Sequence, residues 1–229
     1  LFEVGGVFLP APAGEALPLE PRLLALVLTG QRYPGGWDVK QNAGLDFYDL
    51  KGLVEELMDT LHIAVTFAPA EHPSFHPGKC AEMKAGEVRL GLLGALHPQV
   101  RENYDLEMPL LAAAIDLEAL IPLIPALGYP VQAISEFPPI LEDIAVVVDE
   151  TLPAERLEQV IRQAGGKLLT GLRLFDIFRG PQLGEGKKSM AYALTYQAPD
   201  RTLTDKDASA VRQKIIRRLE QELSAKLRS

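Results

Sequence analysis

The stretch LEDIAVVVD, residues 141–149, opens the run of elements that decides the fold of the last part of the chain. A short apolar run of this kind predicts a strand. Residues 153–164 then predict a helix, because Pro153 suits a first turn and four apolar residues fall on one face, Leu157, Val160, Ile161 and Ala164. The pair Gly165-Gly166 ends this helix.

Two more strands and a second helix complete this run. Residues 168–179 and 189–197 predict strands, which are joined by the basic, glycine-rich loop GPQLGEGKK. A helix follows at residues 204–223, where Thr204 and Asp207 resemble a capping box, and the last few residues can form a fourth strand. The order β-α-β-β-α-β predicts a ferredoxin-like domain.

The preceding part of the chain predicts one long helix among several strands. Apolar residues at spacings of three and four place the helix at residues 46–61, with Asp46 as its N-cap. Short links between the strands suit an antiparallel sheet. The predicted strands are residues 1–8, 22–29, 63–67, 80–84, 88–96 and 110–116, with a loop at 68–79, a short helix at 98–103 and a linker at 120–132.

Composition indicates two packed domains and excludes a membrane span. The 229 residues are 47% apolar, yet no apolar run approaches the roughly 20 residues that a spanning helix needs. The chain begins with Leu1 and no leader is visible, so we expect a fragment of a longer protein. Cys80 is the single cysteine, which excludes an intramolecular disulfide and fits a cytoplasmic protein.

Charge is distributed unevenly between the two parts. The net charge of −8 argues by itself against nucleic-acid binding. Residues 1–136 carry 8 Lys and Arg against 18 Asp and Glu, whereas residues 137–229 carry 15 against 13. An acidic part followed by a mildly basic part suits a protein-binding scaffold with an RNA-binding tail.

Several separate motifs carry a family resemblance over essentially the whole chain. SEFPPILEDIAVVVDE, LFDIFRG, GEGKKS and RTLTD resemble the C-terminal anticodon-binding domain of the bacterial phenylalanine–tRNA ligase beta subunit. FEVGGVF, DFYDLKG, FHPGKCAEM and GLLGALHPQV resemble the catalytic-like core of the same subunit. One position departs from the family pattern, because Glu142 stands where relatives commonly have arginine before the first-strand Asp143.

The resemblance implies an α+β fold, with an antiparallel class II synthetase-like core domain at residues 1–134 and a ferredoxin-like βαββαβ domain at residues 135–229. It implies a non-catalytic fragment that packs on the alpha subunit of an alpha2-beta2 heterotetramer and binds the anticodon stem-loop of tRNA(Phe). The whole enzyme would use ATP and Mg²⁺, and this fragment would bind no cofactor and no membrane.

Residues 167–189 combine cations with an aromatic side chain, as RNA recognition requires. Strand alternation groups Arg173, Phe175, Ile177 and Arg179 on one face, which suggests a stacking platform. The loop at 184–188 predicts a flexible cationic tip. The predicted tRNA-binding residues are Lys167, Arg173, Phe175, Arg179, Lys187, Lys188 and Ser189. The alternative for each strand aromatic, including Phe178, Tyr192 and Tyr196, is packing in the core.

The first part offers little catalytic chemistry. His72, His76 and Cys80 have the spacing of a zinc site but lack a fourth ligand nearby, so we expect no metal there. Its four arginines, Arg22, Arg32, Arg89 and Arg101, lie outside the contexts that class II catalytic motifs use. The apolar run at residues 90–96 and the apolar face of the long helix suit either core or interface, and we expect core for most of them.

Two other functions remain open at this stage. The βαββαβ order also serves ligand-sensing regulatory modules that bind small molecules, because fold does not decide function. A purely structural interaction protein is the third possibility. Binding to tRNA would separate the leading prediction from both alternatives.

Overall fold

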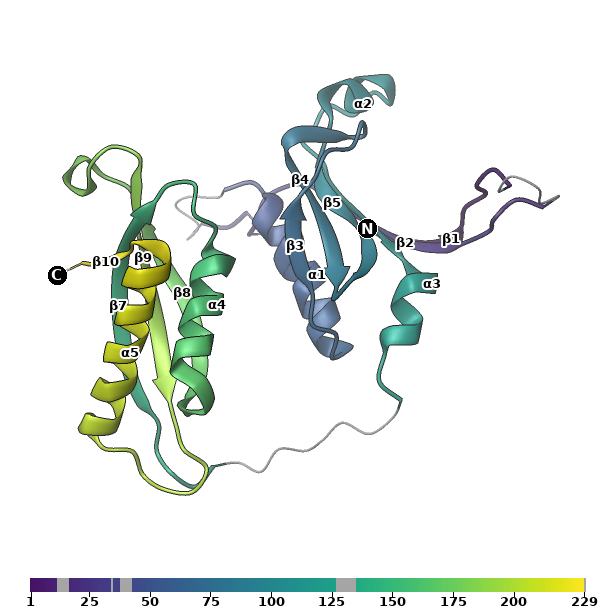
Figure 1. Cartoon of the computed structure of the whole chain (residues 1–229). Coiled ribbons are helices and arrows are strands. Elements are labelled where there is room, and N and C mark those ends of the chain that lie inside the picture. Colours follow the sequence, from purple (N-terminus) through teal and green to yellow (C-terminus); the bar gives the residue numbers. More distant parts are fainter. Residues whose placement is uncertain (12–16, 34, 38–42, 127–134, 229) are drawn as a thin grey trace. The chain divides into compact units, whose positions relative to one another are not determined.

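The computed structural model describes residues 1–11, 17–33, 35–37, 43–126 and 135–228. The chain divides into two compact units, Leu1–Tyr129 and Pro130–Ser229 (Figure 1). Each unit has its own cluster of buried apolar residues. Within the described ranges, no helix has the length and apolarity that crossing a membrane would need.

The first unit is a six-stranded antiparallel sheet with α1 (Phe47–Thr60) packed on one face. The sheet order is β1-β2-β6-β5-β4-β3. The short helix α2 (Pro98–Asn103) follows β5. The strands are β1 Phe2–Gly6, β2 Arg22–Leu28, β3 Thr66–Pro69, β4 Phe75–Ala85, β5 Val88–Leu96 and β6 Leu111–Asp116. This arrangement confirms the antiparallel α+β prediction.

Helix α1 forms as its sequence predicts. Leu50, Val54 and Met58 lie one turn apart and are fully buried against the sheet. Burial of a side chain of this size contributes roughly 1.5–3 kcal/mol. The apolar surface of α1 is therefore part of the core of its own unit.

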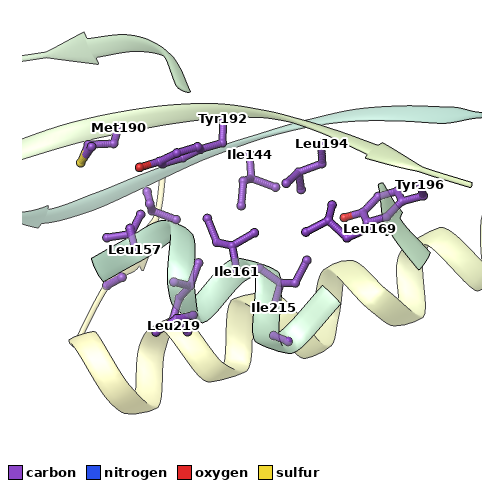
Figure 2. Close-up of a cluster of buried hydrophobic side chains, with 14 of the residues drawn as sticks. Ile144, Leu157, Ile161, Leu169, Met190, Tyr192, Leu194, Tyr196, Ile215 and Leu219 are labelled. Carbon is purple, nitrogen blue, oxygen red and sulfur yellow. The ribbon is translucent and has the colours of Figure 1, made fainter. Parts of the chain in front are cut away.

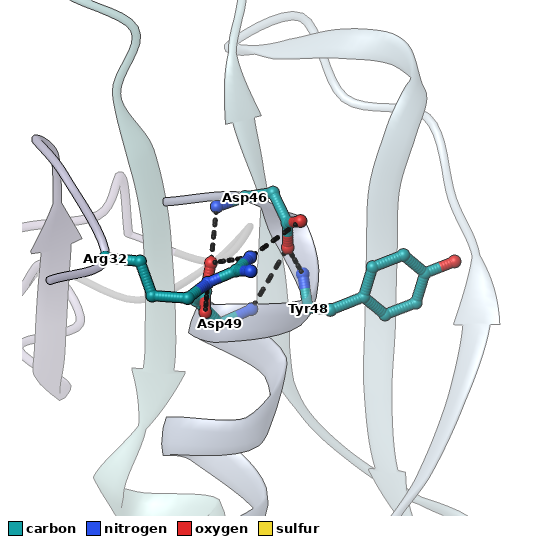
Figure 3. Close-up of polar contacts among 4 residues, drawn as sticks. All are labelled: Arg32, Asp46, Tyr48 and Asp49. Atoms are coloured by element: carbon teal, nitrogen blue, oxygen red, sulfur yellow. Dashed lines mark hydrogen bonds and ion pairs between the residues drawn. The ribbon is translucent and has the colours of Figure 1, made fainter. Parts of the chain in front are cut away.

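The N-terminus of α1 is held by charged groups, as Figure 3 shows. Asp46 and Asp49 form a capping box, in which the Asp46 carboxylate accepts hydrogen bonds from the backbone N–H groups of Tyr48 and Asp49. Arg32 lies beside both carboxylates, 2.9 Å from Asp49 Oδ1 and 3.1 Å from Asp46 Oδ2. The hydrogen bonds from Arg32 are the largest cause that lowers the pKa of Asp49. Arg32 thus ties the preceding segment to the helix.

Three predictions in the first unit were wrong in detail. The loop expected at residues 68–79 contains the start of β4. This strand includes an irregular stretch, since Phe75 pairs with Leu96 but Cys80 pairs with Gly94. Strand β3 begins at Thr66, three residues later than expected. The expected linker starts in helical structure, since α3 (Leu117–Leu120) ends at its first residue and a 3-10 turn (Ile121–Leu123) follows. Residues 127–132 of the expected linker lie outside the described residues.

The second unit has the predicted β-α-β-β-α-β order and confirms the ferredoxin-like fold. Its antiparallel sheet has the order β10-β7-β9-β8. A short turn of 3-10 helix, Gly166–Leu168, links α4 to β8. The elements are β7 Ile140–Asp149, α4 Ala154–Gly165, β8 Leu169–Phe178, β9 Lys187–Tyr196, α5 Asp205–Leu223 and β10 Lys226–Leu227.

Both helices of this unit cover the same face of the sheet (Figures 1 and 2). Leu157 and Ile161 of α4, with Ile215 and Leu219 of α5, point to the sheet and are at most 1% exposed. Helix α5 starts with the predicted capping box of Thr204 and Asp207, and Gly166 ends α4 with a φ of 59° that suits glycine.

The sheet contributes alternate residues to this core. Met190, Tyr192, Leu194 and Tyr196 of β9 are fully buried. The Tyr192 hydroxyl donates a 3.4 Å hydrogen bond to the Ala154 carbonyl, and burial raises the pKa of Tyr192. The two tyrosines therefore pack in the core, and the remaining face of the sheet faces away from both helices.

Candidate nucleic-acid interface

The face of the four-stranded sheet that carries no helix is called the open face here. Paired residues in neighbouring strands share a face, so the register identifies its members. Its side chains are small across the centre and charged or aromatic at the sides. The central members are Asp143, Ala145 and Val147 of β7, Ser189, Ala191 and Ala193 of β9, Arg173, Asp176 and Phe178 of β8, and Lys226 of β10. The same register continues the face to Leu141, Gly171 and Thr195 at one end and to Asp149 and Lys187 at the other.

An irregularity in β8 decides which of its residues reach the open face. Leu174 pairs with Tyr192 and Asp176 pairs with Ala191, so Phe175 is an additional residue between them. A bulge of this kind shifts the alternation of side chains by one position. Arg173 therefore shares the open face with Asp176 and not with Ile177.

The predicted grouping of Arg173, Phe175, Ile177 and Arg179 on one face was consequently wrong. Ile177 pairs with Met190, which is a core residue of the opposite face. Phe178 pairs with Ser189 and joins the open face instead. Phe175, at the irregularity itself, is 48% exposed and is no core residue.

Arg228 reaches across the open face to Phe178. Its backbone N–H donates a 2.8 Å hydrogen bond to the Ala145 carbonyl, which fixes the residue after β10 beside β7. Its guanidinium carbon lies 4.7 Å from the centre of the Phe178 ring, although Phe178 belongs to the far edge strand. The small side chains of Ala145 and Ala191 stand between these strands in the register. A cation stacked on a ring, above small residues, is a suitable platform for an unstacked base.

The charges of the open face are mixed and exposed. Arg173 and Lys226 are exposed cations, and Asp143 and Asp176 are exposed carboxylates. Among the described residues, no ion pair holds Arg173. This arrangement can offer a cation to a phosphate and carboxylates to base amino groups at the same surface.

The basic loop between β8 and β9 differs from the predicted free cationic tip. Lys187 and Lys188 belong to β9, and Lys187 forms a 2.9 Å ion pair with Asp149 of the neighbouring strand. Lys188 is only 8% exposed, and its Nζ donates a 2.8 Å hydrogen bond to the Glu150 carbonyl. The expectation of a free cationic tip was therefore wrong for Lys188, whose buried ammonium has a backbone acceptor.

Arg179 also has an acidic neighbour. Its Nη2 lies 2.8 Å from Glu150 Oε1, and this hydrogen bond is the largest cause that lowers the pKa of Glu150. Arg179 and Lys187 thus stabilise the junction of β7 with the β8–β9 loop, and both side chains remain partly exposed.

The remaining predicted residues are spread over the unit. Lys167 is exposed in the turn before β8, at the end of the sheet where Gln197 bonds to Leu168. The other end of β9 holds Lys187, about 30 Å away at 3.3 Å for each residue of a strand. Ser189 pairs with Phe178 on the open face and is 2% exposed. The structure therefore groups Arg173, Ser189 and Lys187 on one face, and separates Lys167 from the lysines of β9.

Sequence reasoning missed Asp176, Phe178 and Arg228. The irregularity at Phe175 leaves no clear mark in the sequence, so simple alternation assigned Asp176 and Phe178 to the core face. Arg228 had a usable signal, because a fourth strand at the C-terminus would place this arginine beside the first strand of the sheet.

Glu142 lies away from this surface. It pairs with Leu194 on the face that the helices cover, and its Oε2 is buried without a hydrogen-bond partner in the described parts of the chain. An arginine at this position would also point to the face that the helices cover, because the strand register sets the direction of its side chain. Glu142 is therefore no member of the open face.

The first unit shows no comparable constellation. Within the described residues, no three or more His, Cys, Asp or Glu side chains gather to hold a metal ion. The Nδ1 atoms of His72 and His97 accept hydrogen bonds from the backbone N–H groups of Ser74 and Gln99. Cys80 is buried, which raises the pKa of its thiol.

Comparisons with known proteins agree with this division of the chain. Residues 135–228 match the model of the ferredoxin-fold anticodon binding domain, which defines the second unit as a member of a tRNA-recognition class. Residues 1–117 match the model of the phenylalanyl tRNA synthetase beta chain CLM domain. The chain belongs to the phenylalanyl-tRNA synthetase beta chain family.

Curated relatives match over the whole of this chain. Phenylalanine–tRNA ligase beta subunits from Clostridium acetobutylicum, Symbiobacterium thermophilum and Moorella thermoacetica are 39%, 41% and 42% identical to it. The chain covers 27%, 25% and 28% of these relatives, so it spans about a quarter of their length. These matches confirm the family prediction and do not favour a small-molecule-sensing module.

Proposed function

We propose that this chain is the part of a phenylalanine–tRNA ligase beta subunit that packs on the alpha subunit and binds tRNA(Phe). Residues 1–134 form the packing domain, and residues 135–229 bind the anticodon stem-loop. The enzyme is an alpha2-beta2 heterotetramer of the cytoplasm. The alpha subunit holds ATP and Mg²⁺ and performs the aminoacylation, and this fragment alone catalyses no step of it.

The stacked pair of Arg228 and Phe178 on the open face is the observation that carries the RNA-binding proposal. The guanidinium carbon of Arg228 lies 4.7 Å from the centre of the Phe178 ring. Both residues belong to the unit that matches an anticodon-binding model, on the sheet face without helices. Stacking of a base on an aromatic side chain is worth about 1–3 kcal/mol and tolerates different bases. Arg173 supplies an exposed cation on the same face, suited to a phosphate.

The predicted residues take different parts in this proposal. Arg173 and Ser189 belong to the open face, and Phe175 extends it at the edge strand. Lys167, Arg179 and Lys187 add positive potential at its margins, each from an exposed position. Lys188 supports the sheet through the Glu150 carbonyl and makes no contact with RNA.

The test is titration of labelled tRNA(Phe) with this chain at two salt concentrations. Arg173→Ala with Arg228→Ala should weaken binding at least tenfold and reduce the salt slope by about one for each lost phosphate contact. Lys214→Ala with Arg217→Ala is the matched control, because it removes two exposed charges from α5, on the covered side of the sheet.

Two results would contradict the proposal. Equal losses in both double variants would mean that the overall charge attracts RNA and that the open face has no special part. ATP–pyrophosphate exchange with phenylalanine by the isolated chain would contradict its non-catalytic role.

A further inference from the structure

Three buried polar atoms lie between α5 and the sheet of the second unit without a hydrogen-bond partner in the described part of the chain. They are Oε2 of Glu142 on β7, the hydroxyl oxygen of Tyr196 on β9 and Nε of Arg212 on α5. Within the described residues, no other buried side-chain nitrogen or oxygen lacks a partner. Such an atom costs about as much free energy as a lost hydrogen bond, so three at one place indicate a shared polar partner.

Strand register and helix periodicity bring these side chains to one place. The register makes Glu142 and Tyr196 diagonal neighbours on the face of the sheet that the helices cover. Diagonal neighbours on one face of an antiparallel pair lie about 7–8 Å apart, which is within reach of long side chains. Arg212 precedes the buried Ile215 by three residues, so the two share the face of α5 that meets the sheet. Figure 2 shows Ile215 and Tyr196 on opposite sides of the core between that helix and the sheet.

The charges of Glu142 and Arg212 both act on the Tyr196 hydroxyl. Burial, with a smaller contribution from Glu142, raises the pKa of Tyr196 to about 12, and Arg212 opposes this shift. The hydroxyl is therefore protonated at neutral pH and can donate a hydrogen bond. Although both charges are near the hydroxyl, none of the three unpartnered atoms bonds to another.

The chemistry of the three atoms selects a small neutral ligand. The Glu142 carboxylate would repel an anion, and the Arg212 guanidinium would repel a cation. A water molecule can accept hydrogen bonds from the Arg212 Nε–H and the Tyr196 O–H, and it can donate one to Glu142 Oε2. Buried waters typically make about three hydrogen bonds to polar groups that would otherwise have no partner.

We propose that Glu142, Tyr196 and Arg212 form a binding site for one structural water molecule, which links α5 to β7 and β9. A water-mediated hydrogen bond is nearly as favourable in enthalpy as a direct one, so this site holds the last helix on the sheet. The inference does not rest on the proposed function, because the site lies on the covered side of the sheet, away from the open face.

The first test counts long-lived water molecules by magnetic relaxation dispersion of the water oxygen. Glu142→Leu with Arg212→Leu should hold one such water fewer than the unaltered chain, because an apolar site stays dry. Arg218→Leu with Glu222→Leu is the matched control, since it removes an ion pair of the same residue types from the exposed side of α5 and should keep the full count. Thermal melting verifies that each variant is folded. Equal counts in the unaltered chain and the Glu142 and Arg212 variant would overturn the inference.

The second test uses Tyr196→Phe, which removes only the hydroxyl and keeps the packing of the ring. In the unaltered chain it should raise the unfolding equilibrium constant about tenfold, as loss of a buried hydrogen bond does. In the background of Glu142→Leu with Arg212→Leu it should raise the constant less than about threefold, because the bridging water is already absent. Chemical denaturation measures both changes.

Two results of the second test would overturn the inference. Equal changes in the two backgrounds would mean that the hydroxyl is not coupled to the charged pair. Unequal changes with an unaltered water count would mean that the three side chains bond to one another directly in solution.

Discussion

The two faces of the four-stranded sheet are made by the same strands but have opposite compositions. On the covered face, Tyr192 and Leu194 are completely buried beneath two helices. On the open face, Ala191 and Ala193 alternate with them and leave room above the sheet. The difference shows how a period of two lets one strand build a core and a binding surface together.

The largest effect expected from this comparison is on the covered face. Leu194→Ala should lower the free energy of unfolding by about 2–5 kcal/mol, because it leaves a cavity in a packed core. Arg173→Ala, on the open face, should change it by less than about 0.5 kcal/mol. Chemical denaturation of the two variants measures both values. Similar losses would mean that the two faces do not differ in structural importance.

Binding should show the reverse order. Phe178→Ala should weaken tRNA binding by about tenfold, since it removes the ring on which Arg228 stacks. Ile177→Ala, one residue away on the covered face, should leave affinity within about twofold. Titration of labelled tRNA(Phe) at constant salt measures both affinities. A larger loss in Ile177→Ala would break the proposed division.

A smaller effect concerns the start of α5, which covers the sheet. Hydrogen bonds from Thr204 lower the pKa of Asp207, so the ionised carboxylate stabilises the folded state. This contribution is present above the pKa of about 4 for unfolded aspartate, and it is lost as pH falls through the lower pKa of the folded state. Asp207→Asn should therefore destabilise the chain at pH 7 and lose that difference in acid. Thermal melting across pH measures the stability that Asp207→Asn loses relative to the unaltered chain, with Asp205→Asn as the control. A stability loss in Asp207→Asn that does not depend on pH would contradict this account.

The smallest effect should follow removal of a cation that already has a partner. Lys187 is paired with Asp149 on an exposed surface, and such pairs contribute at most about 1 kcal/mol. Lys187→Ala should weaken tRNA binding less than Arg173→Ala does, because Arg173 has no ion-pair partner in the described residues. Titration of labelled tRNA(Phe) with each single variant under the same conditions compares the two losses of affinity. Equal losses would mean that the basic loop is a primary contact for RNA.

Much of the fold could be predicted from the sequence, because strong local signals agree with the final packing. The periodicity of α1 and α5, the N-cap at Asp46 and the capping box at Thr204 located both helices closely. Strand β4 was partly missed, because Pro77 and Gly78 indicate a loop, whereas pairing with β5 on both sides of them, at Phe75 and from Cys80 onward, keeps them within the strand. Pairing between distant strands is a tertiary effect that local propensity does not include.

The candidate site was harder to predict than the fold. Counting charges identified the basic segment correctly, but it could not show that Arg179 and Lys187 have the acidic partners Glu150 and Asp149. Glu150 lies 29 positions before Arg179, and Asp149 lies 38 positions before Lys187. Each carboxylate meets its cation only through strand pairing. The sequence indicated where cations gather, and the register determined which of them remain available.

The additional residue at Phe175 has a consequence for how this surface could change during evolution. Loss of this one residue would restore one-to-one pairing and keep Asp176 and Phe178 on the open face and Ile177 on the covered face, because the residues beyond the irregularity already pair in that order. A single-codon deletion would thus remove the irregularity and the exposed Phe175 ring but leave the rest of the open face as it is. Recognition by this sheet should therefore change more through substitutions on the open face than through a change of chain length at this point.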